Sequence, residues 1–319
     1  MTNRQPLLLT RALPPRAMAL LQSRVDLTCN PHDRALTRDE LLRMINGQRG
    51  VITMLTDRVD AELLDAAPNL RVVANYAVGY NNIDVAAARA RGITVTNTPG
   101  VLTNATADLT WALILGVTRR LVEGDRLVRA GRWNGWSPTQ LLGMDLADAV
   151  LGIVGMGRIG RAVASRARAF GMRVIYAARR PMPDVDPNWN AVALNDLLAA
   201  ADIVSLHVPL TDVTRHLIGA AQLAAMKPSA YLINTSRGPV VDEAALVEAL
   251  RTGRIAGAGL DVYEREPEIH SDLSACENTL LLPHLGSATT ATRERMGSMV
   301  VDNVIAVLEG RRPPNPVEA

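Results

Sequence analysis

The chain has 319 residues, 48% hydrophobic and 21% charged, a length that favours two domains and a composition that excludes an extended disordered or fibrous protein. A formal net charge of +2 gives no attraction to nucleic acid, and no run of about 18 uncharged apolar residues is present to cross a membrane. Because Cys29 and Cys276 lack the spacing of zinc ligands or of a disulfide framework, we expect a cytoplasmic protein with no metal, no nucleic-acid partner and no membrane partner.

The first hundred residues alternate short β-like runs with helical stretches. The helical stretches include Thr37 to Asn46 and Asp84 to Arg91, and the β-like runs are Leu7 to Thr10, Val51 to Leu55, Val72 to Asn75 and Thr94 to Asn97. This alternation predicts a parallel sheet covered by helices. The turn residues Asn97 to Gly100 then break both patterns, and we place a domain boundary and hinge there.

A long helical pattern follows from about Asn104 to Ala130 and ends at Gly131, which suits a C-terminal cap. The loop after it, Arg132 to Pro138, carries two of the four tryptophans. Large aromatic side chains in such a loop indicate either an interface between subunits or burial within the parent domain, and both interpretations stay open.

A second alternating series starts at Val150. Its six β-like runs are Leu151 to Val154, Arg173 to Ala177, Asp202 to Val208, Tyr231 to Asn234, Gly257 to Val262 and Thr279 to Leu282. This pattern predicts a second doubly wound sheet. A last helical stretch, Thr289 to Gly310, has no strand after it, so we expect it to return to the first domain, with a loose tail from Pro313 to Pro316.

A glycine-rich turn follows the first run of this second series and opens a helical stretch. A strand, a glycine turn and a helix in this order form a dinucleotide site, in which the first Gly makes the turn, the second admits the pyrophosphate and the third packs helix on strand. A purely structural turn is the alternative. We expect cofactor contacts from Gly155, Gly157, Arg158, Ile159 and Gly160.

The residue that selects between the two nicotinamide cofactors should lie about 20 residues further on, at the end of the next strand. Ala178 occupies the place where an NAD enzyme has Asp or Glu, and Arg179 and Arg180 follow it. A guanidinium binds a 2′-phosphate through charge-assisted hydrogen bonds, whereas a carboxylate repels it. The sequence therefore predicts NADPH, with NADH as the second choice, unless the two arginines form only a solvated loop.

Three later segments bring polar side chains to predicted strand ends, where ligands of open α/β sheets bind. They carry Arg237, Glu266 and His284. Reduction of a keto acid needs a cation for the carboxylate, an acid for the carbonyl oxygen and a group that keeps this acid charged. Because a carboxylate favours a protonated imidazole beside it, we expect Glu266 to keep His284 cationic near neutral pH. Taken singly, each of the three is more often a structural or surface residue.

These motifs, in this order and over essentially the whole chain, resemble the D-isomer-specific 2-hydroxyacid dehydrogenase family. The resemblance implies that Arg237 binds and polarises the substrate, that His284 is the general acid and base, and that Glu266 sets its protonation. It also implies that Asp261 meets the nicotinamide end of the cofactor. The segments that carry it are Gly155 to Gly160, Asn234 to Gly238, Asp261 to Pro267 and Pro283 to Thr289.

The resemblance has further implications. The run from Asn75 to Asp84 looks like the loop whose backbone amides, here those of Val78 and Gly79, hold the substrate carboxylate, although a tight turn without a ligand is the alternative. Family members swap the long helix between subunits, which implies a homodimer. The remaining cofactor contacts are expected from Thr106, His207, Pro209, Thr235, Ser236, Asp261 and Gly286.

The predicted fold is therefore α/β, with two doubly wound parallel-sheet domains, a Rossmann NAD(P)-binding domain inserted in a flavodoxin-like substrate domain. Residues 1–99 and 288–319 are expected to form the discontinuous substrate domain, and residues 100–287 the NADP-binding domain.

The resemblance to one branch of the family implies a more specific function. The end of the second strand and the run Leu102 to Asp108 look most like the glyoxylate and hydroxypyruvate reductases, which implies NADPH-dependent reduction of a small 2-keto acid to the D-2-hydroxy acid. A dehydrogenase for a bulkier 2-keto acid or for 3-phosphoglycerate is the main alternative, and a cofactor-sensing regulator without turnover is a remote one.

Overall fold

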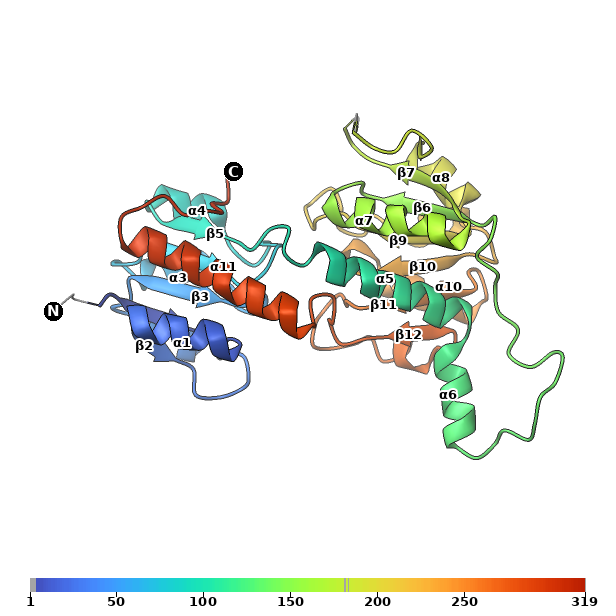
Figure 1. Cartoon of the computed structure of the whole chain (residues 1–319), viewed down its shortest axis with the longest axis horizontal. Coiled ribbons are helices and arrows are strands. Elements are labelled where there is room, and N and C mark those ends of the chain that lie inside the picture. The colour runs from blue at the N-terminus through green and yellow to red at the C-terminus, as the bar shows by residue number, and fades with distance from the viewer. Residues whose placement is uncertain (1–3, 181, 183, 319) are drawn as a thin grey trace. The chain divides into compact units, whose positions relative to one another are not determined.

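The chain divides into two compact units in the computed structural model, which describes residues 4–180, 182 and 184–318 (Figure 1). One unit comprises Met1–Leu102 and Ser287–Ala319, and the other comprises Thr103–Gly286. Among the described residues, no helix has the length and apolar character needed to cross a membrane.

The first unit is built around a five-stranded parallel sheet in the order β2-β1-β3-β4-β5. Its strands are β1 (Pro6–Leu9), β2 (Asp26–Cys29), β3 (Gly50–Thr53), β4 (Val72–Asn75) and β5 (Thr94–Thr96). Its helices are α1 (Pro15–Arg24), α2 (Arg38–Ile45), α3 (Ala61–Asp65), α4 (Val85–Ala90) and α11 (Thr290–Leu308). This strand order is that of the flavodoxin-like doubly wound fold.

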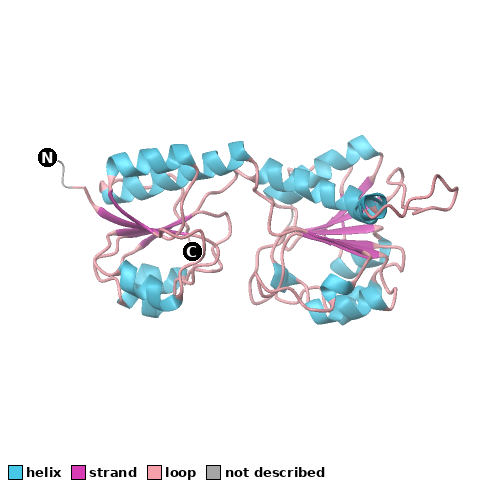
Figure 2. Cartoon of the chain, turned by 90° about the horizontal axis from the view of Figure 1, so that it is seen from below, coloured by secondary structure: helices cyan, strands magenta, loops and turns pink. Residues whose placement is uncertain are grey.

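Helices cover both faces of this sheet because its strands are apolar on both sides (Figure 2). Leu7 and Leu9 pack with α1 and α11 on one face, whereas Leu8 and Val51 pack with α2 and α3 on the other. The successive residues of β1 therefore serve two separate cores, as the period of two in a strand requires.

The second unit contains a seven-stranded parallel sheet in the order β12-β11-β10-β9-β6-β7-β8. Its strands are β6 (Val150–Val154), β7 (Arg173–Ala177), β8 (Asn190–Ala191), β9 (Ile203–Leu206), β10 (Tyr231–Asn234), β11 (Gly257–Leu260) and β12 (Thr279–Leu281). Its helices are α5 (Thr103–Thr118), α6 (Leu121–Arg129), α7 (Arg158–Ala167), α8 (Leu194–Ala200), α9 (Ala220–Ala225) and α10 (Glu243–Arg251).

Counted from β6, this order is 3-2-1-4-5-6 with one more strand at the edge, which is the Rossmann arrangement. Helices α5 and α7 cover one face of the sheet, and α8, α9 and α10 cover the other. The point where the order reverses lies between β6 and β9, so ligands are expected outside the carboxyl ends of these strands. The predicted fold class is confirmed.

The predicted helix from Asn104 to Ala130 is wrong as a single element. It is two helices, α5 and α6, separated at Arg120, which has a left-handed φ of 53°. The backbone oxygen of Thr118 accepts a hydrogen bond from Met144 N at 3.0 Å, so a loop takes the place of the next helical turn. Gly131 has a φ of 64° after α6, as its predicted capping role requires.

The tail from Pro313 to Pro316 is bound rather than loose, so that prediction is also wrong. Asn315 O accepts from Asn97 N at 3.3 Å, and Val317 N donates to Val95 O at 2.9 Å. Asn315 N also donates to the side chain of Asn303 on α11, at 3.0 Å. Two backbone hydrogen bonds and one to the side chain of Asn303 therefore hold the tail in place beside β5.

Candidate active site

The glycine turn lies between β6 and α7, and its three glycines have different surroundings. Gly155 has a φ of 98°, and a Cβ there would lie 2.7 Å from the backbone oxygen of His207. A Cβ on Gly160 would overlap the backbone oxygen of Gly155, whereas a Cβ on Gly157 would meet no atom within 4 Å. Gly155 thus makes the turn, Gly160 allows close contact between helix and strand, and Gly157 leaves the open approach that a pyrophosphate needs.

The amino end of α7 faces this open space. Gly157 is the N-cap residue and provides no side chain to satisfy the first amides of the helix, and Arg158 and Ile159 follow in the first turn. Unsatisfied amides at a helix amino end attract an anionic group. The residues present therefore fit a dinucleotide phosphate.

The carboxyl end of β7 lies directly beside the glycine turn, because Gly155 N donates to Ala177 O at 2.9 Å. Ala178, Arg179 and Arg180 follow and are exposed. Asp184, further along the chain, is tied to α7, since Arg161 Nη1 donates to Asp184 O at 2.9 Å. The position at which the sequence predicts cofactor selection thus carries two arginines and no carboxylate.

His207 and Pro209 follow β9, the neighbour of β6 at the reversal of strand order. His207 Nε2 lies 2.9 Å from Ser205 Oγ, and burial lowers the pKa of His207 to about 3, so the ring is neutral at physiological pH. The oxygen of Pro209 accepts from Thr214 Oγ1 at 2.6 Å, which shapes the loop after the strand.

Arg237, Glu266 and His284 follow β10, β11 and β12, which are three neighbouring parallel strands. The carboxyl ends of such strands meet at one edge of the sheet, which brings the three residues into one region. His284 Nδ1 lies 2.7 Å from Glu266 Oε2, and the two side chains keep 31% and 34% of their surface exposed. The pair is thus formed and still accessible to a small molecule.

Electrostatics keep the Glu266 carboxylate charged. Desolvation raises its pKa, but the hydrogen bond and charge of His284, the amide of Tyr263 and the charge of Arg237 together lower the pKa below its usual value. The amide of Tyr263 reaches Glu266 Oε1 at 3.0 Å. Oε1 is therefore held by this amide, while Oε2 faces the imidazole of His284.

Arg237 is held in a turn by its neighbours. Burial lowers the pKa of its guanidinium, and the charge of Glu266 opposes that effect. Its Nη1 donates to Ser236 O at 2.7 Å, and Asn234 Nδ2 donates to Arg237 O at 3.0 Å. A guanidinium stays protonated in such surroundings, so its positive charge acts on the Glu266 carboxylate.

His284 has a left-handed φ of 55°, which costs energy in a residue with a side chain. Asp261, which is only 1% exposed, supports this turn. Its backbone oxygen accepts from His284 N at 2.9 Å, and its two carboxylate oxygens accept from Leu285 N at 2.6 Å and Gly286 N at 2.8 Å. Desolvation raises the pKa of Asp261, although both amides oppose it.

The remaining expected cofactor residues join the same network. Thr106 Oγ1 donates to Gly286 O at 2.9 Å. Thr110, one turn further along α5, lies 2.9 Å from the hydroxyl of Thr235, and the hydroxyl and amide of Ser236 both donate to Asn234 Oδ1. Hydrogen bonds therefore connect helix α5 with the turns at the carboxyl edge of the sheet. The expected cofactor residues in this region are Thr106, Thr235, Ser236, Asp261 and Gly286.

Val78 and Gly79 belong to the other unit and lie on the loop that follows β4. Asn97 Nδ2 donates to Val78 O at 2.7 Å, and Asn75 Nδ2 donates to Gly79 O at 2.8 Å. Both residues are partly buried, and the next residue, Tyr80, is exposed. The loop is therefore held by side-chain amides rather than by a regular backbone ladder.

One network of hydrogen bonds near the site is not predicted from the sequence. Glu264 N donates to Glu243 Oε1 at 2.5 Å, and His216 Nε2 lies 2.8 Å from Glu264 Oε1. Burial raises the pKa of Glu243. Gly238 packs against the backbone of Tyr263 so closely that a Cβ would overlap it. This contact and the hydrogen bonds together hold the segment that carries Arg237 beside the segment that carries Glu266. No motif marks the network, because its members are far apart in the chain.

No group of three His, Cys, Asp or Glu side chains suited to a metal ion occurs in the part of the chain that the structure describes. The functional groups at the carboxyl ends of β10, β11 and β12 are one guanidinium, one carboxylate and one imidazole.

Comparison with known proteins agrees with this geometry. The family model for the D-isomer specific 2-hydroxyacid dehydrogenase NAD binding domain matches residues 111–286. Glyoxylate reductase from Thermococcus onnurineus is 47% identical, with 96% of this chain and 94% of the relative covered.

Two solved structures are similar over nearly the whole chain. A protein of Thermus thermophilus has a TM-score of 0.92 at 52% identity, covering 98% of this chain and 100% of its own. An NADPH-dependent glyoxylate/hydroxypyruvate reductase of Sinorhizobium meliloti, in complex with NADP and malonate, has a TM-score of 0.88 at 37% identity, with 98% and 97% covered. The chain therefore belongs to the D-isomer specific 2-hydroxyacid dehydrogenase family and is an oxidoreductase that acts on CH–OH groups with a nicotinamide cofactor.

Proposed function

We propose that the protein reduces glyoxylate or hydroxypyruvate to the corresponding D-2-hydroxy acid, with NADPH as the preferred reductant. The observation that carries the proposal is the 2.7 Å contact between His284 and Glu266, which follow β12 and β11 at the edge of the sheet where β10 leads to Arg237. The names of the relatives, among them the glyoxylate reductase of Thermococcus onnurineus, support the choice of substrate.

The mechanism assigns one task to each side chain. A bound reduced nicotinamide supplies the hydride. Arg237 binds the substrate carboxylate and polarises the keto group, and the backbone amides of Val78 and Gly79 bind the same carboxylate. His284 donates a proton from Nε2 to the carbonyl oxygen, because its Nδ1 is engaged by Glu266. Glu266 stabilises the protonated imidazole before transfer.

The two units then have separate tasks in this proposal. The unit Thr103–Gly286 binds the cofactor and carries the proton donor, and the unit with Val78 and Gly79 supplies amides for the substrate. The proposal thus gives a task to each expected domain: residues 100–287 bind the cofactor, and residues 1–99 with 288–319 bind the substrate.

The configuration of the product tests the proposed function. Hydroxypyruvate and NADPH incubated with the protein should give D-glycerate, which chiral chromatography separates from L-glycerate. The same incubation with Arg237→Gln protein controls for contaminating reductases. Formation of the L-isomer, or of equal amounts of both isomers, would contradict the proposed function.

We attribute the preference for NADPH to Arg179 and Arg180. Replacing both with Ala should raise KM for NADPH by about 10- to 100-fold, because charge-assisted hydrogen bonds to the 2′-phosphate are lost. KM for NADH should change by less than about twofold. Initial rates with each cofactor measure this, and Arg173→Ala, at the opposite end of β7, is the matched control. Equal effects on both cofactors would contradict the assignment.

We also propose that the protein is a homodimer, held by the segment from α6 to Leu142. Helix α6 buries none of its residues within the chain. Apolar side chains are exposed along the segment, among them Val128 at 58% and Trp136 at 83%. Such a surface is typical of an interface between subunits.

The double variant Val128→Glu, Trp136→Glu should be a monomer, because two charges would have to be buried in the interface without partners. Light scattering after size-exclusion chromatography gives the mass directly. Val213→Glu changes another exposed valine, 69% exposed and outside the segment, and should leave a dimer intact. A wild-type monomer, or a dimer in the double variant, would exclude this interface.

A further inference from the structure

Three successive carbonyl groups of the loop after β4 are turned toward the protein. Ala77 O accepts from Thr98 N at 2.8 Å, Val78 O accepts from Asn97 Nδ2 at 2.7 Å, and Gly79 O accepts from Asn75 Nδ2 at 2.8 Å. One backbone amide and two side-chain amides thus hold three consecutive peptide groups.

The direction of these carbonyls fixes the direction of the next amides. In a trans peptide the C=O of one residue and the N–H of the next point to opposite sides. The N–H groups of Val78, Gly79 and Tyr80 therefore point away from the donors on Thr98, Asn97 and Asn75. Within the described residues, none of these three N–H groups donates to a protein acceptor. Successive amides turned away from internal acceptors are suited to bind an anion.

The two asparagines are themselves held firmly. Asn75 is fully buried, and its Oδ1 accepts from Thr53 Oγ1 at 3.0 Å. Asn97 O accepts from Asn303 Nδ2, a buried side chain on α11, at 3.0 Å, while Asn97 N donates to Asn315 O. Each side-chain amide therefore reaches the loop from a fixed support and not from a mobile surface.

We propose that Asn75 and Asn97 are positioning residues that orient the amides of Val78, Gly79 and Tyr80 toward the substrate carboxylate. The inference rests on the proposed function, because that function places a carboxylate at this loop. The asparagines act only through the peptide groups that they hold. An aspartate at either position keeps the shape of the side chain but loses the N–H donor, and it repels the carbonyl that it should hold.

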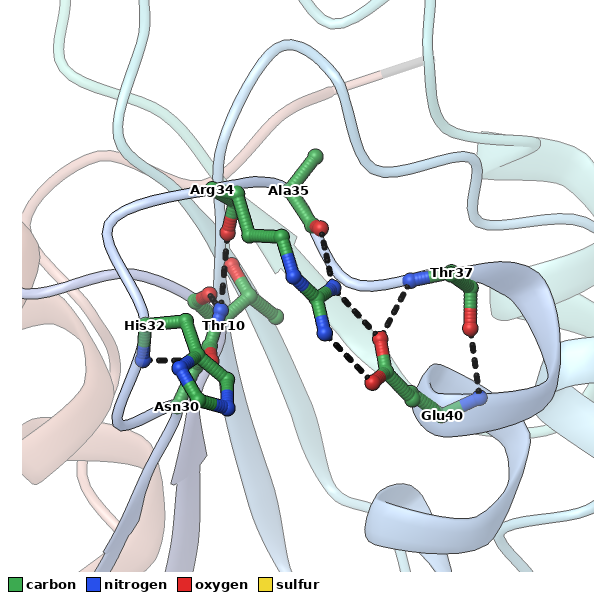
Figure 3. Close-up of polar contacts among 7 residues, drawn as sticks. All are labelled: Thr10, Asn30, His32, Arg34, Ala35, Thr37 and Glu40. Atoms are coloured by element: carbon green, nitrogen blue, oxygen red, sulfur yellow. Dashed lines mark hydrogen bonds and ion pairs between the residues drawn. The ribbon is translucent and has the colours of Figure 1, made fainter.

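A matched control is available at the same edge of the sheet. Asn30 is 3% exposed and also donates from Nδ2 to two backbone oxygens, those of Thr10 and Arg34 (Figure 3). Its loop leads toward α2 and does not include Val78 or Gly79. Asn30→Asp therefore removes the same kind of hydrogen bond and should cost similar stability, without reaching the three amides.

The test uses oxamate, a 2-keto acid analogue that is not reduced, with the NADPH-loaded protein. Labelling valine carbonyl carbons with ¹³C and glycine amides with ¹⁵N selects two Val-Gly pairs of this sequence, Val78-Gly79 and Val154-Gly155. The Gly79 signal reports on the proposed carboxylate site, and the Gly155 signal reports on the cofactor turn. Oxamate should shift Gly79, and NADPH should shift Gly155.

Asn75→Asp and Asn97→Asp should each weaken oxamate binding by about 10- to 100-fold, with the response of Gly155 to NADPH unchanged. Asn30→Asp should change oxamate binding by less than about twofold. Equal weakening in all three variants would show a general loosening of the sheet edge and overturn the proposal, as would unchanged binding in Asn75→Asp and Asn97→Asp.

The proposed function can fail separately. If oxamate binding responds as expected but the wild type reduces no 2-keto acid, the positioning role stands and the reductase function is wrong. If the wild type turns over glyoxylate but oxamate never shifts Gly79, the reductase function stands and the positioning role is overturned.

Discussion

Replacing His284 with Gln is expected to lower kcat for glyoxylate reduction by about 10²-fold or more, because a positioned proton donor contributes about 10²- to 10⁴-fold. Glutamine preserves much of the volume and can still donate to Glu266, but it carries no proton that it can transfer. Affinity for NADPH should be little changed, since the glycine turn expected to contact the phosphates follows β6, whereas His284 follows β12. Steady-state rates with fluorescence titration of the cofactor separate the two effects.

His32→Gln is the control for this variant, because His32 is exposed on a loop of the other unit. Its kcat should equal that of the wild type. A His284→Gln enzyme with wild-type kcat would remove His284 from the proton transfer and leave Arg237 as the only assigned group at the reacting carbonyl.

The Glu266→Gln variant is expected to change the pH dependence of kcat/KM for the reduction. Desolvation raises the pKa of Glu266, but the hydrogen bond and charge of His284, the amide of Tyr263 and the charge of Arg237 together outweigh it and lower the pKa, so the carboxylate is charged throughout the neutral range. An amide does not favour a protonated imidazole as a carboxylate does. The alkaline limb of kcat/KM for reduction should therefore move to lower pH in the variant. Superimposable pH profiles would show that Glu266 does not set the protonation of the donor.

Replacing Arg237 with Gln is expected to lower kcat/KM for the 2-keto acid by about 10²- to 10³-fold, the usual cost of losing a charged donor at a developing oxyanion. Arg237→Lys keeps the positive charge but loses the planar fork that fits a carboxylate, so an intermediate loss is expected. Arg265→Gln, an exposed arginine next to Glu266, should have a small effect.

Substrate and cofactor parameters distinguish this role from a structural one. If Arg237 acts on the substrate, KM for NADPH should stay within about twofold in both variants while kcat/KM for the keto acid falls. A parallel loss of cofactor and substrate affinity would indicate that the turn from Asn234 to Gly238 has collapsed.

The parts of the fold that sequence predicted best are those with continuous apolar runs. Tyr231 to Asn234 and Arg173 to Ala177 are strands with the predicted bounds, because buried parallel strands are apolar on both faces. Strand β2 cannot be predicted in the same way, because Asp26–Cys29 lies at the sheet edge and its residues are alternately exposed and half-buried, with none fully buried. The break at Arg120 was missed because both flanking segments keep helical periodicity.

The residues of the candidate site, too, are predictable only where the sequence contains a local motif. The glycine turn and the Arg, Glu and His segments have local motifs, and the strand order then explains why three distant segments share one edge. Asn75 and Asn97 have no such motif. Their proposed role depends on hydrogen bonds to Gly79 and Val78, and those partners become apparent only when the chain is folded.

The most direct test of the whole account is the initial rate of loss of absorbance at the reduced nicotinamide band. NADPH and NADH are offered separately, each with glyoxylate, hydroxypyruvate and pyruvate. Rapid oxidation of NADPH with glyoxylate or hydroxypyruvate, slower oxidation with NADH and little reaction with pyruvate is the predicted result. No oxidation of either cofactor with any of the three acids would contradict the account.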